Sequence, residues 1–199
     1  MSKSKRTLKS AGAAAVILSA MGATVVPALA AGPVAHHPLA LTPVQVYIGG
    51  ELTAFGLRLS TAIKLVRPQT AFPVYAPAFV PPRYSPLQLA VTPTQRGVSG
   101  GYATMTYGVK PVTNANSGPS IVIAQAANGV PVVGGKTITA TVGVYPGALH
   151  EFATPGHDLL ILAWSEGTSG FTVSTDAAVS HLSSATIVKM ASSLRAITP

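Results

Sequence analysis

Apolar and polar residues alternate in short runs along much of the second half of the chain. These runs are rich in β-branched and aromatic residues and are bounded by Gly, Pro or Asn, a pattern that predicts β-strands. The intervals between them are too short for crossover helices, which favours antiparallel pairing. The predicted strands cover residues 87–91, 102–109, 120–126, 136–144, 159–164 and 170–174.

The end of the chain follows a helical period instead. Its apolar residues fall on one face of a helix, which predicts an amphipathic segment that covers the sheet. Ser183 or Ser184 offers a hydroxyl that caps the first free amides of this helix. The residues of the apolar face are Ile187, Met190, Ala191 and Leu194.

The region before these strands is less regular. Residues 44–48 alternate in part and predict a short strand, whereas residues 55–67 fit a helix about as well as a strand. Residues 68–86 are rich in proline, with aromatic residues between the prolines. Because proline fixes φ and removes a donor, we expect an extended strap that lays its aromatic rings over a sheet. A ligand for a Pro-rich recognition module is the alternative for this strap.

Together these elements predict a single α+β domain over residues 44–199. It consists of a twisted antiparallel sheet of about six strands, with the C-terminal helix packed on it and the Pro-rich strap crossing it.

The N-terminus has the pattern of a secretory signal peptide over residues 1–30. Basic residues precede an apolar stretch, and small residues stand at the two positions before a cleavage point after Ala30. An uncleaved membrane anchor is the alternative, although the stretch is short and rich in Ala and Gly. We predict an extracytoplasmic protein, secreted or associated with the cell envelope, with a flexible lead-in at 31–43 and no membrane span in the mature chain.

Charge is scarce along the chain. Four of its thirteen basic residues lie in the predicted leader, so nine basic and five acidic residues remain, with a net charge of +4. The basic residues are scattered and do not form the stripe that nucleic acids require. Cysteine is absent, which excludes disulfides, thiolate metal sites and a lipid anchor on cysteine. Few carboxylates also predict a fold that tolerates acid, although a biased composition would explain the same scarcity.

Several motifs resemble a bacterial envelope family, domain of unknown function 4367. The family closes with a strand that ends in Trp, an acidic residue and Gly, then a second strand and a helix; the matching residues here are 162–164 (Leu-Ala-Trp), 166–167 (Glu-Gly), 171–173 and 190–194. Its Pro-rich opening is similar to residues 72–84, with Arg83 where Gly is usual. The resemblance covers roughly residues 57–197 and favours a helix near 60–66. Some members are extracytoplasmic ends of anti-sigma-type regulators and others are secreted proteins. No activity is assigned to the family, so the resemblance implies no catalytic residues.

One cluster of titratable residues offers metal chemistry. His150 and Glu151 precede the turn at 152–156, and His157 and Asp158 follow it. Across a hairpin, two imidazoles and two carboxylates would suit zinc. Adjacent residues of a strand point to opposite faces, however, so the four side chains converge only with distortion. Solvated residues at a loop end are the alternative, and we predict neither a metal nor another cofactor.

A possible binding surface comprises Trp164, Glu166, Tyr75 and Tyr84. An aromatic ring beside an acid suits a sugar or a cation, but a Trp at the end of an apolar strand is typically a core residue whose N–H is satisfied at the rim. The chain has no phosphate loop, dinucleotide fingerprint or zinc-protease motif.

We therefore predict a non-enzymatic envelope domain that binds an unidentified envelope protein or a cell-wall polymer, with a role in signalling as one option. A secreted metal-dependent enzyme that uses the His150 cluster, and a structural component of a surface layer, are the alternatives.

Overall fold

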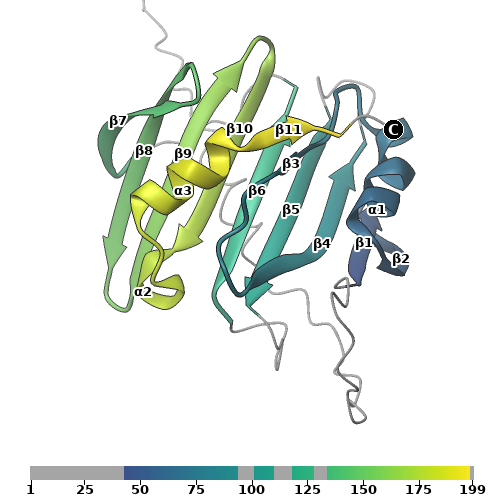
Figure 1. Cartoon of the computed structure of the whole chain (residues 1–199), viewed down its shortest axis with the longest axis horizontal. Coiled ribbons are helices and arrows are strands. Elements are labelled where there is room, and N and C mark those ends of the chain that lie inside the picture. Colours follow the sequence, from purple (N-terminus) through teal and green to yellow (C-terminus); the bar gives the residue numbers. More distant parts are fainter. Residues whose placement is uncertain (1–42, 94–100, 110–117, 128–133, 198–199) are drawn as a thin grey trace, which may run out of the picture.

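The computed structural model describes residues 43–93, 101–109, 118–127 and 134–197, of which 57% are in strands and 18% in helices. Residues 1–42, which contain the predicted signal peptide and nearly all of the lead-in, lie outside the described part. Nine strands form one large sheet in the order β2-β1-β4-β5-β6-β10-β9-β8-β7 (Figure 1). They are β1 (Val44–Ile48), β2 (Glu51–Leu57), β4 (Tyr84–Thr92), β5 (Tyr102–Val109), β6 (Ser120–Ala126), β7 (Lys136–Val142), β8 (Tyr145–Thr154), β9 (His157–Glu166) and β10 (Ser169–Asp176).

Neighbouring strands of this sheet pair antiparallel, except that β1 and β4 pair parallel. After β6 the described chain resumes at the far edge of the sheet and returns through β7, β8 and β9 until β10 pairs with β6. The predicted antiparallel character is confirmed. The predicted fold class, an α+β domain with about six strands and one helix, is wrong. The protein is mostly β, with a nine-stranded mixed sheet and a second, two-stranded sheet.

The prediction missed strands that lie toward the edges of the sheet. β2 is largely exposed, and β8 is exposed at both ends and contains Pro146 and Gly147 near its start. A strand reveals itself in a sequence by alternating apolar residues because one of its faces is buried. β2 and β8 have little of this alternation, so the end of β2 was assigned to a segment that fits a helix or a strand and β8 was not predicted. The exposed strand β7 does alternate Thr with apolar residues, and it was predicted.

Within the described ranges, four helical segments accompany the sheets: α1 (Leu59–Val66), the short 3-10 helix η2 (Arg67–Gln69), α2 (Ala177–Ser180) and α3 (Ser184–Ser192). The closing helix is confirmed as α3, and Ser183 caps it by accepting a hydrogen bond from the Thr186 amide. Three residues of its predicted face, Ile187, Met190 and Ala191, are buried in α3. The fourth, Leu194, is also buried but lies in the strand that follows the helix. No helix in the described ranges is long and apolar enough to cross a bilayer.

The helices and the small sheet lie on the same face of the large sheet (Figure 1). The small sheet pairs β3 (Tyr75–Pro77), in the predicted strap, with β11 (Leu194–Ala196), directly after α3. Side chains from β1, β4, β5, β6, β9 and β10 meet α1, the strap and α3 in one continuous core. Its largest fully buried side chains include Tyr107, Phe171, Ile63, Leu89, Ile121 and Leu162.

The strap is fastened to the sheet by a buried glutamine. Gln125 of β6 is 3% exposed, and its side-chain nitrogen donates to the Pro73 carbonyl at 2.7 Å. Its side-chain oxygen accepts from the Tyr75 amide at 3.3 Å. Proline-rich backbone makes few ladder bonds of its own. One amide side chain therefore satisfies two backbone groups that the strap would otherwise bury without a partner.

Replacement of Gln125 by Leu should be strongly destabilising. The substitution keeps an apolar stem but leaves the Pro73 carbonyl and the Tyr75 amide without partners, which costs about 2–4 kcal/mol of unfolding free energy. Urea denaturation of the two proteins measures this loss. Thr104→Val, a change of similar size on the neighbouring strand β5, is the control and should cost much less; equal stability of Gln125→Leu and the parent would contradict this account of the strap.

Candidate functional site

An aromatic cluster lies where the β9–β10 hairpin meets the strap. Trp164 of β9 and Phe171 of β10 are cross-strand partners, and their rings stack with centroids 5.2 Å apart. Tyr75 of the strap meets Phe171 edge to face at 5.1 Å. Both arrangements are favourable geometries for aromatic pairs. The cluster fixes the strap against this end of the sheet.

Glu166 closes the outer side of the cluster. One of its carboxylate oxygens accepts a hydrogen bond from the Trp164 indole at 3.2 Å. Desolvation raises the pKa of the Tyr75 hydroxyl, and the charge of Glu166 and the neighbouring Tyr145 raise it further. Tyr75 therefore remains a neutral hydrogen-bond donor beside a carboxylate.

Trp164 is only 5% exposed, so its ring is a core element with a satisfied N–H and does not form an open platform for a sugar. The exposed part of the cluster is formed by Tyr75, Glu166 and the β7–β8 turn. The register that pairs Gly147 with Trp164 brings Tyr145 level with Glu166. Val144 in that turn is 85% exposed and Tyr145 is 37% exposed.

The β7–β8 turn is held by the closing helix. The Gly143 amide donates to the Ser192 hydroxyl of α3 at 3.0 Å. Gly143 has a φ of 62°, a left-handed conformation that glycine adopts without strain. The turn therefore presents its apolar side chains from a fixed position. We call Tyr75, Val144, Tyr145 and Glu166 the hairpin-tip surface.

Tyr84 does not belong to this surface. It begins β4, and its hydroxyl donates to the Ser180 carbonyl of α2 at 3.4 Å. Tyr84 therefore lies at the opposite end of β4 from Thr92, the residue that pairs with Tyr102. Of the four residues of the predicted binding surface, the structure thus brings Tyr75, Trp164 and Glu166 together and places Tyr84 elsewhere.

The predicted His150 cluster is divided by the sheet. His150 is opposite Ile161 and Glu151 opposite Leu160, so their side chains point to opposite faces. Glu151 pairs with Lys136 at 3.4 Å, and His150 contacts the Gly134 carbonyl at 3.2 Å.

His157 and Asp158 occupy the start of β9, several residues along the ladder from His150 and Glu151. No group of three or more potential metal ligands occurs among the residues that the structure describes.

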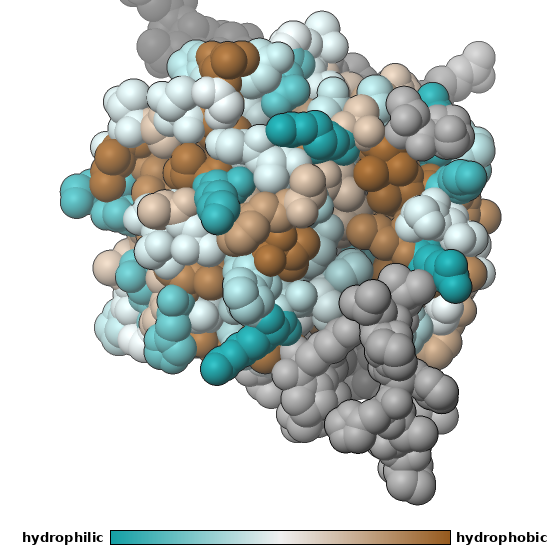
Figure 2. Space-filling view, viewed as in Figure 1, coloured by the Kyte–Doolittle hydropathy of each residue, from teal (hydrophilic) through white to brown (hydrophobic). Residues whose placement is uncertain are grey.

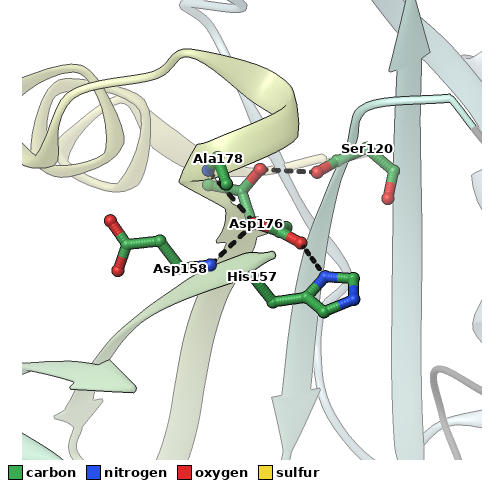
Figure 3. Close-up of polar contacts among 6 residues, drawn as sticks. Ser120, His157, Asp158, Asp176 and Ala178 are labelled. Atoms are coloured by element: carbon green, nitrogen blue, oxygen red, sulfur yellow. Dashed lines mark hydrogen bonds and ion pairs between the residues drawn. The ribbon is translucent and has the colours of Figure 1, made fainter. Parts of the chain in front are cut away.

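His157 instead pairs with a residue that the sequence did not single out. Its Nδ1 lies 2.6 Å from Asp176 Oδ2, and the Asp176 side chain also accepts from the Asp158 and Ala178 amides at 3.0 and 3.1 Å (Figure 3). Figure 3 shows the Asp158 carboxylate pointing away from this pair. Asp176 thereby joins β9, β10 and the start of α2, whose N-cap it forms.

A sequence signal for this pair existed. Once the Glu166–Ser169 turn is recognised, counting along the hairpin places Asp176 opposite Leu159, two residues from His157 on the same face. The Asp followed by Ala-Ala-Val-Ser is also an N-cap pattern.

A scan against protein-family models and a search of curated proteins gave no match to this chain. The resemblance to domain of unknown function 4367 therefore stays a prediction. Arg83 has a φ of 78°, in the left-handed region that favours glycine.

The Asp176 contacts predict a pH-dependent stability. The His157 hydrogen bond and the Asp158 amide lower the pKa of Asp176 below its ordinary value, so the carboxylate stabilises the fold above the unfolded pKa of about 3.9. This contribution is lost as pH falls through the lower, folded pKa. Asp176→Asn should therefore reduce the melting temperature at pH 6 and narrow the difference between pH 6 and pH 2.

Circular dichroism melts of both proteins between pH 2 and pH 7 give this comparison. Asp158→Asn is the matched control, because its carboxylate points away from the pair (Figure 3). Parallel pH profiles for Asp176→Asn and the parent would show that the Asp176 contacts do not contribute.

Proposed function

We propose that this chain is a non-enzymatic domain of the cell envelope that acts outside the cytoplasm and binds a partner protein through the hairpin-tip surface. The observation that carries the proposal is the pair Val144 and Tyr145, exposed at the tip of a turn that α3 holds in place. An ordered turn presents these side chains without the entropy loss that a flexible loop incurs on binding.

The chemistry of the surface favours a protein over a polysaccharide. Val144 offers an apolar knob without hydrogen-bonding groups, and tyrosine is enriched in protein interfaces. Tyr75 and Glu166 supply a donor and an acceptor at its border. The indole of Trp164, which could otherwise stack on a sugar ring, is covered by Phe171.

Exposed apolar side chains also occur elsewhere, with Leu52 and Phe55 of β2 54% and 60% exposed. Figure 2 shows small apolar and polar areas interspersed over the face that carries the helices, without a large patch of either kind. The sequence contains few charged residues, so large charged patches are not expected on the surface either. Recognition then depends on shape and on a few anchors more than on long-range electrostatic attraction.

The envelope location rests on the basic and apolar pattern of residues 1–30. A role in envelope signalling depends on the partner, since a domain outside the cytoplasm transmits a signal only through a protein that spans the membrane.

Val144→Asp should weaken partner binding without loss of stability. The introduced carboxylate would need desolvation in an apolar contact and would stand near Glu166, so we expect binding to weaken at least tenfold. The tagged chain from Ala31 onward is incubated with detergent-solubilised membranes and, separately, with purified cell wall from its own cells. Captured proteins are identified by mass spectrometry, and their affinities for parent and variant are compared.

Val179→Asp provides the control, because Val179 is an exposed apolar residue of α2, 39% accessible, outside the hairpin-tip surface. It should retain the partner. Equal capture by parent and Val144→Asp would refute the assignment of the surface. Retention by the cell wall alone would replace the protein partner with a wall polymer.

A further inference from the structure

The two edges of the large sheet differ in a way that bears on self-association. β2 forms one edge, and its pairing with β1 is interrupted by two register shifts. Gly56 within β2 has a φ of 81°, which bends the strand. Such irregularities are a common means of preventing edge-to-edge pairing. Arg58 and Lys64, both exposed, add positive charge beside this edge.

The β7 edge lacks these features. Seven consecutive residues, Lys136 to Val142, pair with β8 in unbroken register. Lys136 is the one charged residue of the strand, and it is paired with Glu151 at the strand's start. No described strand pairs with the outer side of β7, which lies at the left margin of Figure 1. The strand therefore presents a regular row of unpaired amides and carbonyls.

We propose that β7 is a self-association edge at which a second copy of this chain adds its own β7 antiparallel, across a two-fold axis near Thr139. The sequence of the strand is complementary to itself in this register. Thr139 meets Thr139 of the other copy, and Thr137 meets Thr141. On the other face Ile138, 38% exposed, meets the smaller side chain of Ala140.

Cross-strand threonine pairs and the pairing of a large with a small apolar residue both stabilise antiparallel sheets. Charge also favours a second copy at this edge. The two Lys136 residues lie at opposite ends of the shared ladder, each across from Val142, so like charges do not meet. The Lys136–Glu151 pair is neutral, although the chain as a whole is basic.

The size of the contact limits its strength. A ladder of seven residues is about 24 Å long and buries less surface than a standard interface of about 1,600 Å². We therefore expect a reversible dimer with a dissociation constant in the micromolar range or above, in which the large sheets of both copies are continuous.

A cysteine at the two-fold axis tests this register directly, because the chain contains no cysteine of its own. In the full chain, Thr139→Cys places two thiols opposite each other at a Cα separation of about 5 Å, within reach of a disulfide. Diamide oxidation should convert most of this variant to a covalent dimer on a non-reducing gel. Thr137→Cys should crosslink much less, because its copies lie about 13 Å apart along the ladder.

Thr53→Cys on the exposed β2 edge is the control for random collision. Sedimentation velocity of the cysteine-free parent from low to high micromolar concentration should show dimers. The variant Thr139→Lys sets two ammonium groups opposite each other and should raise the dissociation constant of the dimer at least tenfold. A parent that stays monomeric throughout, or equal crosslinking at residues 53, 137 and 139, would overturn the proposal. Neither measurement involves the hairpin-tip partner, so the two proposals fail independently.

Discussion

Helices and strap of the described chain all lie on one face of a nine-stranded sheet, and most of the structure follows from the need to cover that face. Its apolar side chains are the main source of stability, because burial of apolar surface is the dominant favourable term in folding. The covering segments come from both ends of the domain: α1 and the strap precede the central strands, and α3 follows them. The two ends of the domain therefore meet, and β3 pairs with β11 across the sheet.

The strap is also attached to the sheet and to α3 by hydrogen bonds, in addition to the apolar contacts. A strap rich in proline has few amides to donate, so it is fixed at specific points. Gln125 binds its backbone from the sheet, and the Ser193 hydroxyl accepts a hydrogen bond from the Phe79 amide at 2.9 Å. Lys189 of α3 lies 4.2 Å from the centre of the Phe79 ring, a cation–π contact that adds to this attachment. Tyr75 is placed by these contacts, and with it the border of the hairpin-tip surface.

Scarcity of charge shapes both proposals. A surface with few ionic groups lacks the repulsion that keeps exposed strands and apolar turns apart, so backbone edges and single apolar residues gain importance. At the other end of the hairpin, the Asp176 side chain contacts His157 and accepts from the Asp158 and Ala178 amides, and so joins β9, β10 and α2.

The sequence by itself determined the elements whose burial is strong and periodic. Strands β5 and β6 and the helix α3 were predicted nearly to their ends, because each has one buried face that imposes a period on the residues. Trp164 and Glu166 were recognised as a pair, since they stand two residues apart on one strand.

Tertiary structure alone decided the rest. Exposed strands such as β2 and β8 carry little periodic signal, and the parallel pairing of β1 with β4 joins segments that are distant in sequence. The same holds for the site. Tyr75 reaches Phe171 and Glu166 only because the strap crosses the sheet. His157 and His150 are separated because the register of β8 and β9 pairs His157 with Thr154 and His150 with Ile161. Local preference decides what an element is. Which elements become neighbours depends on the burial of the whole sheet, which no local window of the sequence contains.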